Sequence, residues 1–194
     1  LPTTLFEIDY LLGVNDEARQ GALRFSASPD DNTFLSPKEK TSIPPLVDLP
    51  QLLSATERLI TDHESIEDLR LLLAPGSSLG GARPKASIRD FDGCLAIAKF
   101  PRKDDALNVV VWEAVTLTLA ENAGIKVPKH RLETILGQSV LIIQRFDRDG
   151  GNRIPFLSAM SMLGVRDNEQ HSYLEMAYAL AQNGAAPEED MKAL

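Results

Sequence analysis

The sequence predicts an α+β fold with a mainly antiparallel sheet in the middle of the chain. Three observations support this fold class: two strand–turn–strand patterns, and one helical pattern between them. The turns fall at Asp92-Gly93 and at Gly137-Gln138, where glycine permits the backbone angles of a tight turn. The extended segments are Lys85 to Ile88, Cys94 to Phe100, Arg131 to Leu136 and Val140 to Phe146.

The helical pattern between the two hairpins covers residues 108–123. Asn108, or an Asp upstream of it, can cap the first turn, and Gly124 stands just past the last one. A second helical region is expected at 159–183, beyond the Gly150-Gly151 turn. The sheet is therefore expected to carry one packed helix and to be followed by the start of a helical part.

Upstream of the sheet the pattern changes twice. Residues 5–12 have helical spacing, and residues 21–25 are expected to be extended. Residues 26–50 contain five prolines, a density that excludes long regular structure and is typical of a connector. Residues 51–73 then place their leucines and isoleucines as in one or two amphipathic helices.

Composition excludes several classes of protein. Of 194 residues, 43% are hydrophobic and 25% charged, which is ordinary for a globular chain and unlike a disordered or fibrous one. A net charge of −8 argues against nucleic-acid binding through bulk charge. The single cysteine, Cys94, excludes an intrachain disulfide and suggests a reducing compartment. No apolar run approaches the roughly 18 residues that a membrane span needs.

A Gly/Ser-rich stretch at residues 76–85 precedes the first strand. Glycines let backbone N–H groups approach an anion, and the serines and Lys85 add donors and positive charge. The stretch matches neither the Walker A loop nor the GxGxxG pattern. An ordinary surface turn is the alternative interpretation, and the residues alone leave both open.

Lys99 and Glu113 form the second candidate. Lys99 shares a strand face with Leu95 and Ile97, and Glu113 shares a helix face with apolar residues. A charge on an apolar face needs a partner of opposite sign, and each is the other's nearest candidate in sequence. A structural salt bridge would satisfy both. A strand lysine paired with a glutamate on the next helix, after a Gly-rich hairpin, is also how protein kinases hold phosphate.

The third candidate is the strand that ends at Gln144, Arg145 and Phe146. A strand leaving the sheet here could offer backbone donors and acceptors to an adenine edge, with Phe146 as an apolar lid. A core strand with a charged end is the alternative, which composition does not exclude.

Five motifs, taken in order, resemble the HipA family of bacterial toxin kinases, and the similarity covers nearly the whole chain. The resemblance implies an ATP- and Mg²⁺-dependent serine/threonine kinase of a type II toxin–antitoxin module in the bacterial cytoplasm. It also implies a HipB-like helix-turn-helix antitoxin as partner, DNA contact only through that antitoxin, and an aminoacyl-tRNA synthetase, typically the glutamyl enzyme, as substrate. The motifs are the run Phe6 to Phe25 (notably Tyr10 to Val14 and Arg19 to Phe25), Ser77 to Lys85, Ile97 to Pro101, Asn122 to Pro128 and Gln144 to Arg148.

Carried over to this sequence, the resemblance implies an autophosphorylation site at Ser78, with Ser77 as its neighbouring alternative. Phosphate there would add up to about two negative charges to the loop that holds ATP and would switch the enzyme off. Glu113 is included among the expected ATP-binding residues because of the lysine–glutamate arrangement of kinases and its place on the helix, not because of a family motif. The expected ATP-binding residues are Gly80, Gly81, Ala82, Arg83, Pro84, Lys85, Lys99, Glu113, Gln144, Arg145 and Phe146.

A kinase also needs a catalytic Asp, with an Asn about five residues later for metal. Asp147 and Asn152 match that spacing. They follow directly on Gln144–Phe146, the linker expected to contact the adenine, and they flank a Gly-Gly turn, so we reject them as catalytic residues. No catalytic or metal-binding residue is therefore expected within these 194 residues. We expect a fragment that begins after the family's usual N-terminal β-rich subdomain and lacks most of the catalytic lobe.

The expected organisation has three parts. Residues 1–74 end an N-terminal subdomain and supply connector helices, residues 75–150 form a kinase-like ATP-gripping lobe, and residues 151–194 begin a helical lobe. Two other functions remain open. A truncated homologue could bind an antitoxin or regulator without turning over ATP, and a small-molecule phosphotransferase could use the same lobe.

Overall fold

The computed structural model describes residues 4, 6–30, 33–35, 43–72, 83–102, 104–166 and 168–194. Its centre is a four-stranded sheet in the order β1-β2-β4-β3, with every neighbouring pair antiparallel. The α+β prediction is thus confirmed. The strands are β1 (Lys85–Arg89), β2 (Leu95–Lys99), β3 (His130–Ile135) and β4 (Gln138–Gln144).

Helix α4 (Val109–Asn122) lies between β2 and β3 in the chain, as the pattern predicts. The Asn108 side chain caps it by accepting the Val111 N–H at 3.2 Å. Gly124 follows the helix with a positive φ of 84°, which costs glycine little. The cap and the glycine fix where the helix begins and ends, and hence where Glu113 sits on it.

The second hairpin differs from its prediction. Its turn lies at Leu136 and Gly137, with φ of 50° and 77°, rather than at Gly137-Gln138. Ile135 pairs with Gln138, which leaves two residues for the turn, and a two-residue turn with two left-handed residues matches the twist of the strands. Strand β4 also ends at Gln144, two residues before the predicted Phe146.

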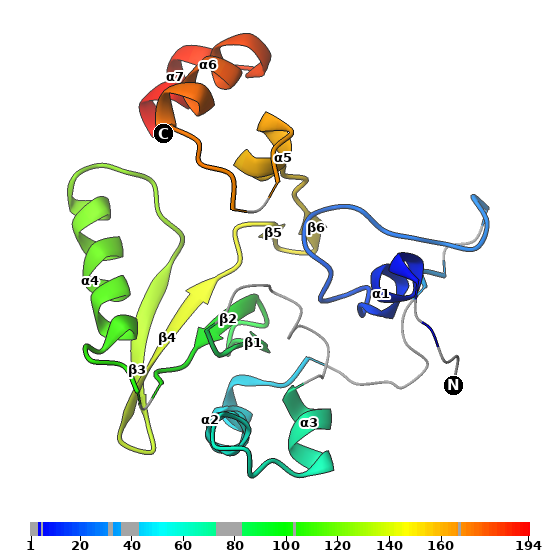
Figure 1. Cartoon of the computed structure of the whole chain (residues 1–194), viewed down its shortest axis with the longest axis vertical. Helices are drawn as coiled ribbons and strands as arrows, with labels where there is room; N and C mark the ends of the chain where they lie inside the picture. The colour runs from blue at the N-terminus through cyan, green and yellow to red at the C-terminus, as the bar shows by residue number, and fades with distance from the viewer. Residues whose placement is uncertain are drawn as a thin grey trace.

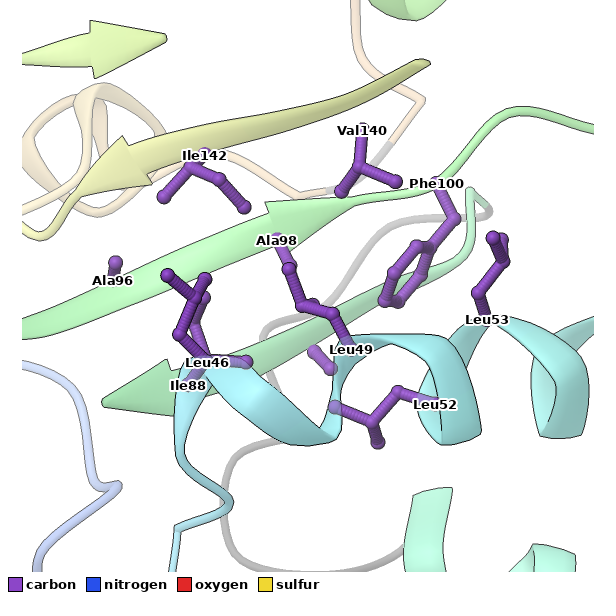
Figure 2. Packing of buried hydrophobic residues seen from close by; sticks show 11 residues of the cluster. Leu46, Leu49, Leu52, Leu53, Ile88, Ala96, Ala98, Phe100, Val140 and Ile142 are labelled. Carbon is purple, nitrogen blue, oxygen red and sulfur yellow. The ribbon is translucent and has the colours of Figure 1, made fainter. Parts of the chain in front are cut away.

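Helix α2 (Leu49–Ile60) packs on one face of the sheet and follows the short 3-10 helix η1 (Leu46–Asp48). Figure 2 shows leucines of these helices pointing into the apolar side chains of the strands. Burying each of these leucines contributes about 1.5–3 kcal/mol. The cluster consists of Leu46, Leu49, Leu52, Leu53, Ala86, Ile88, Ala96, Ala98, Phe100, Val140 and Ile142.

This packing adds to the expected organisation, in which residues 51–73 are connector helices. They do form two helices, α2 and α3 (Ile66–Leu72), but α2 shares the core of the sheet. The sheet therefore has a helix on each face rather than one packed helix. The division of the chain at residue 74 stays a prediction.

The opposite face is covered by α4 on its β3–β4 side (Figure 1). Val110 and Ala114 of the helix pack on Leu141, all three being buried. The β1–β2 side of this face carries a different set of side chains, among them Lys85, Ser87 and Lys99, which strand alternation places together. The end of this face where Lys85 and Lys99 lie positions the candidate site.

The ends of the chain supply the remaining elements. Figure 1 shows α1 beside the β5–β6 hairpin and the last three helices beyond it, away from α2 and α3. The helical region predicted at 159–183 is two helices, separated after Gly164, and a third follows. In the part of the chain that the structure describes, no helix has the length and apolar character to cross a bilayer. The elements are α1 (Glu7–Gly13), β5 (Arg148–Asp149), β6 (Asn152–Arg153), α5 (Ala159–Leu163), α6 (Tyr173–Asn183) and α7 (Pro187–Ala193).

Candidate functional site

Two lysines face each other across the first hairpin. Lys85, the first residue of β1, pairs in register with Lys99, the last residue of β2, so both side chains project from the same face. Like charges directly opposite one another destabilise a sheet. Burial and the nearby Lys99 charge together lower the pKa of Lys85. This end of the hairpin therefore concentrates positive charge that an anion would stabilise.

Glu113 joins the lysines from α4. Lys99 Nζ donates to Glu113 Oε1, and the two side chains remain 30% and 34% exposed. The glutamate also acts on Lys85, where its charge raises the pKa against the larger effect of burial. Two ammonium groups thus share one carboxylate, beside a cavity of about 260 Å³. An anion entering that cavity would meet a surplus of positive charge.

Arg83 and Pro84 line the same cavity, immediately before β1. The Arg83 guanidinium donates to both carboxylate oxygens of Asp105, at 2.8 and 2.9 Å. This pairing lowers the pKa of Asp105 and ties the start of β1 to the β2–α4 connection. Pro84 accepts the Phe100 N–H at 3.1 Å, which closes the open end of the hairpin. The predicted site residues Ser77, Ser78, Gly80, Gly81 and Ala82 lie outside the described residues.

The predicted adenine linker lies at the other end of the sheet. Gln144 pairs with Ala96, whereas Lys99 pairs with Leu141, so the two groups are three residues, about 10 Å, apart along the strands. The Gln144 N–H donates to Lys129 O at 2.8 Å. Phe146 is 62% exposed and meets Phe156 edge to face, with ring centroids 4.9 Å apart. The linker borders a cavity of about 660 Å³ between Lys126 and Asp149.

Arg145 has a different environment from its two neighbours in the linker. Its backbone N–H donates to Leu95 O at 3.0 Å, which extends the β2–β4 ladder by one residue. Its guanidinium is buried and donates to Asp147 through Nε at 2.8 Å and Nη2 at 2.6 Å. The side chain therefore points into the protein, and only the backbone of Arg145 remains at the linker.

Asp147 is buried and accepts hydrogen bonds from several groups. Burial raises the pKa of Asp147, but hydrogen bonds from Arg145 and from the Gly21 N–H outweigh it, so the net pKa is lowered. The Gly21 N–H and Arg148 Nη1 both reach Asp147 Oδ2, at 2.7 and 2.8 Å. A carboxylate committed to these partners is poorly placed to take a proton from a substrate hydroxyl.

Sequence reasoning brought together Lys85, Lys99 and Glu113 but missed two partners. Nothing local singles out Asp105 among the acids that follow β2. Asp16 to Gly21, which contact the segment after the linker, lie more than 120 residues away in sequence, beyond the reach of periodicity. Among the described residues no cluster of three or more His, Cys, Asp or Glu side chains has a metal-binding arrangement.

An antiparallel sheet whose strand lysine pairs with a glutamate on the following helix is the arrangement that protein kinases use in their nucleotide-binding lobe. The comparison with known families agrees with this class. The HipA-like C-terminal domain matches residues 77–194, and the chain therefore belongs to the HipA family, which is known for kinase activity and for toxin–antitoxin systems. No curated protein matches the chain.

Proposed function

We propose that the chain is the ATP-binding portion of a HipA-type serine/threonine protein kinase. In this proposal the whole enzyme phosphorylates an aminoacyl-tRNA synthetase, the glutamyl enzyme first among the candidates. The observation that carries the proposal is the Lys85–Lys99–Glu113 cluster, in which two cations share one carboxylate in the lining of a cavity.

The chemistry of this cluster fits a polyphosphate. Lys99 would contact the phosphates, Glu113 would orient the Lys99 ammonium group, and Lys85 would add a second positive charge beside the phosphates. The backbone at Gln144, Arg145 and Phe146 would face the adenine. ATP supplies the phosphoryl group to be transferred, and the ligands of its Mg²⁺ would come from outside this chain.

The test is nucleotide binding, measured by calorimetry on the chain with MgATP. Lys99→Ala removes the phosphate contact and one of the two cations that share the Glu113 carboxylate, so we expect affinity to fall about tenfold or more. Lys192→Ala, which removes a lysine from α7, is the matched control and should bind as the unaltered chain does. Equal affinity in the Lys99→Ala variant, or normal kinase activity when the change is made in the full reading frame, would overturn the assignment.

Regulation by autophosphorylation at Ser78 is part of the proposal. A phosphate at Ser78, in the Gly/Ser-rich stretch before Arg83, would add up to about two negative charges close in sequence to the cations proposed to bind ATP. Ser78→Ala in the full reading frame is expected to retain kinase activity and to abolish self-inactivation, followed as activity over time after addition of MgATP. Self-inactivation that persists in this variant would place the phosphosite elsewhere, with Ser77→Ala as the next variant.

A second candidate is an interaction module that binds a HipB-like antitoxin without turning over ATP. The observation in its favour is α1, none of whose residues is buried and whose Ile8 and Tyr10 are 53% and 66% exposed. With a net charge of −8, DNA association would come through the antitoxin. Binding of the antitoxin by a chain that binds no MgATP would favour this function over the kinase.

A further inference from the structure

Three arginines hold a turn near the N-terminus against the segment that follows the linker. The turn is Asp16–Gly21, which we name the strap, and its carbonyl groups accept most of these hydrogen bonds. The arginines are Arg145 at the linker, Arg148 on β5 and Arg153 on β6. Sequence separations of 126 to 137 residues make this a tertiary contact between the two ends of the chain.

The strap contacts the linker directly. Arg145 donates to Ala18 O at 2.8 Å and to Arg19 O at 3.3 Å, and the Gly21 N–H donates back to Asp147 at 2.7 Å. Arg145 and Asp147 are each 3% exposed, so these contacts are made away from solvent. Because Arg145 lies between Gln144 and Phe146, fixing its side chain fixes the backbone that would face the adenine.

The β5–β6 hairpin holds the strap from the other side. Arg148 Nη2 donates to Arg19 O at 2.7 Å and to Glu17 O at 3.1 Å. Arg153 donates to Asp16 O and Oδ2, and more weakly to Arg19 O and Gly21 O. These four Arg153 hydrogen bonds all end on the strap.

The strap is also fastened to the end of α1. Arg19, itself 7% exposed, donates through Nη1 to Leu11 O at 2.8 Å and through Nη2 to Val14 O at 3.0 Å. The guanidinium thus satisfies carbonyl groups at the helix end, which have no partner within the helix. The position of α1 and the position of the strap are fixed together.

We propose that the strap is a positioning element of the nucleotide site: it holds the linker at Gln144–Phe146 in the conformation that receives the adenine ring. This inference rests on the proposed ATP binding, and it identifies the contacts that determine the affinity of the site for the adenine base. The phosphate end of the site, at Lys85 and Lys99, lies about 10 Å away along the strands and does not depend on the strap. Loosening the strap should therefore weaken recognition of the base and leave recognition of the phosphates.

The test compares MgATP with inorganic tripolyphosphate, which carries the phosphates without the base. In Arg153→Lys the positive charge remains, but a lysine lacks the planar fork that spans several carbonyls. We expect MgATP affinity to fall about tenfold, because small displacements of a positioned group have large effects. Tripolyphosphate affinity should stay within about twofold, as expected if the phosphate site keeps its geometry.

Two further variants make the result specific. Gly21→Ala alters the strap itself, since a side chain at φ of 67° is strained, and should reproduce the loss. Arg131→Lys is the matched control. It removes the paired hydrogen bonds from the Arg131 guanidinium to the Asp90 carboxylate, which do not involve the strap, and it should leave MgATP affinity unchanged.

The outcomes separate the two proposals. An unaltered chain that binds neither ligand overturns the proposed function, and the strap inference falls with it. An unaltered chain that binds MgATP, beside Arg153→Lys and Gly21→Ala variants of equal affinity, overturns the strap inference alone. Equal losses for MgATP and tripolyphosphate would also overturn it, because they would indicate general damage rather than displacement of the linker.

Discussion

The two ends of strand β2 each have an ion pair beside them, and the pairs differ in burial. At one end Lys99 meets Glu113 with both side chains about one-third exposed. At the other end Arg145 meets Asp147, and their side chains are 2% and 4% exposed. The first pair is joined by the hydrogen bond from Lys99 Nζ to Glu113 Oε1, whereas the second belongs to a network that also includes Gly21 and Arg148.

This difference separates an exchangeable ion pair from a fixed one. A partly exposed lysine keeps water within reach and can trade one anionic partner for another at small cost. A buried guanidinium cannot be left without its carboxylate, because the desolvation of the remaining charge is not repaid. In the proposed function, the exchangeable pair lies where phosphates would bind, and the fixed pair lies at the linker proposed to face the adenine.

The largest expected effect comes from breaking the fixed pair. Asp147→Ala leaves the Arg145 guanidinium buried and removes the acceptor of the Gly21 N–H, so the free energy of unfolding should fall by about 3–5 kcal/mol. Glu113→Ala, at the exposed pair, is the matched change and should cost less than about 1 kcal/mol. Urea denaturation at neutral pH measures both.

Equal losses in the two variants would contradict the distinction between the pairs. If Asp147→Ala yields no folded chain, Asp147→Asn provides the measurement, because it removes the charge but keeps an oxygen that can accept the Gly21 N–H. Its loss should lie between those of the two alanine variants.

The exposed pair was predictable from sequence because each of its members stands out in a local pattern. The two-residue period places Lys99 among apolar neighbours, and the helical period does the same for Glu113. Glycine and asparagine at the turns and the helix cap similarly indicated the elements that position this pair. Local chemistry was sufficient wherever both partners lie in consecutive elements.

The fixed pair and its strap were not predictable in the same way. Arg145 and Asp147 look like a charged end of a strand, and the groups that neutralise and bury them are carbonyls some 127 residues earlier. Backbone acceptors carry no side-chain signature, so no motif marks the strap. The packing of α2 on the sheet was not predicted for a related reason: an amphipathic pattern shows that a helix has a buried face but not what covers it.

The smaller effect is a dependence of stability on acid, to which Asp147 and Asp90 should contribute. The pKa of Asp147 is lowered in the folded chain because Arg145 and Gly21 outweigh burial, and Arg131 lowers the pKa of Asp90. A carboxyl group whose folded pKa is lowered contributes stability above its unfolded pKa, about 3.9, and loses it as pH falls through the folded value. Stability should therefore be constant near neutral pH and fall below about pH 4.

Urea denaturation at a series of pH values from neutral down to about 3 tests whether the free energy of unfolding falls with falling pH. Each carboxylate of this kind adds up to about 1.4 kcal/mol per pH unit to the slope. Asp147→Asn should start from a lower free energy of unfolding and decline less steeply, because it has one such proton fewer to bind on unfolding. Asp90→Asn, which loses its partner Arg131 on the sheet rather than at the linker, should show the same flattening from an independent carboxylate. An Asp147→Asn curve that runs parallel to that of the unaltered chain would mean that Asp147 has the same pKa folded and unfolded, and the network around it would then stabilise the linker through shape alone rather than through charge.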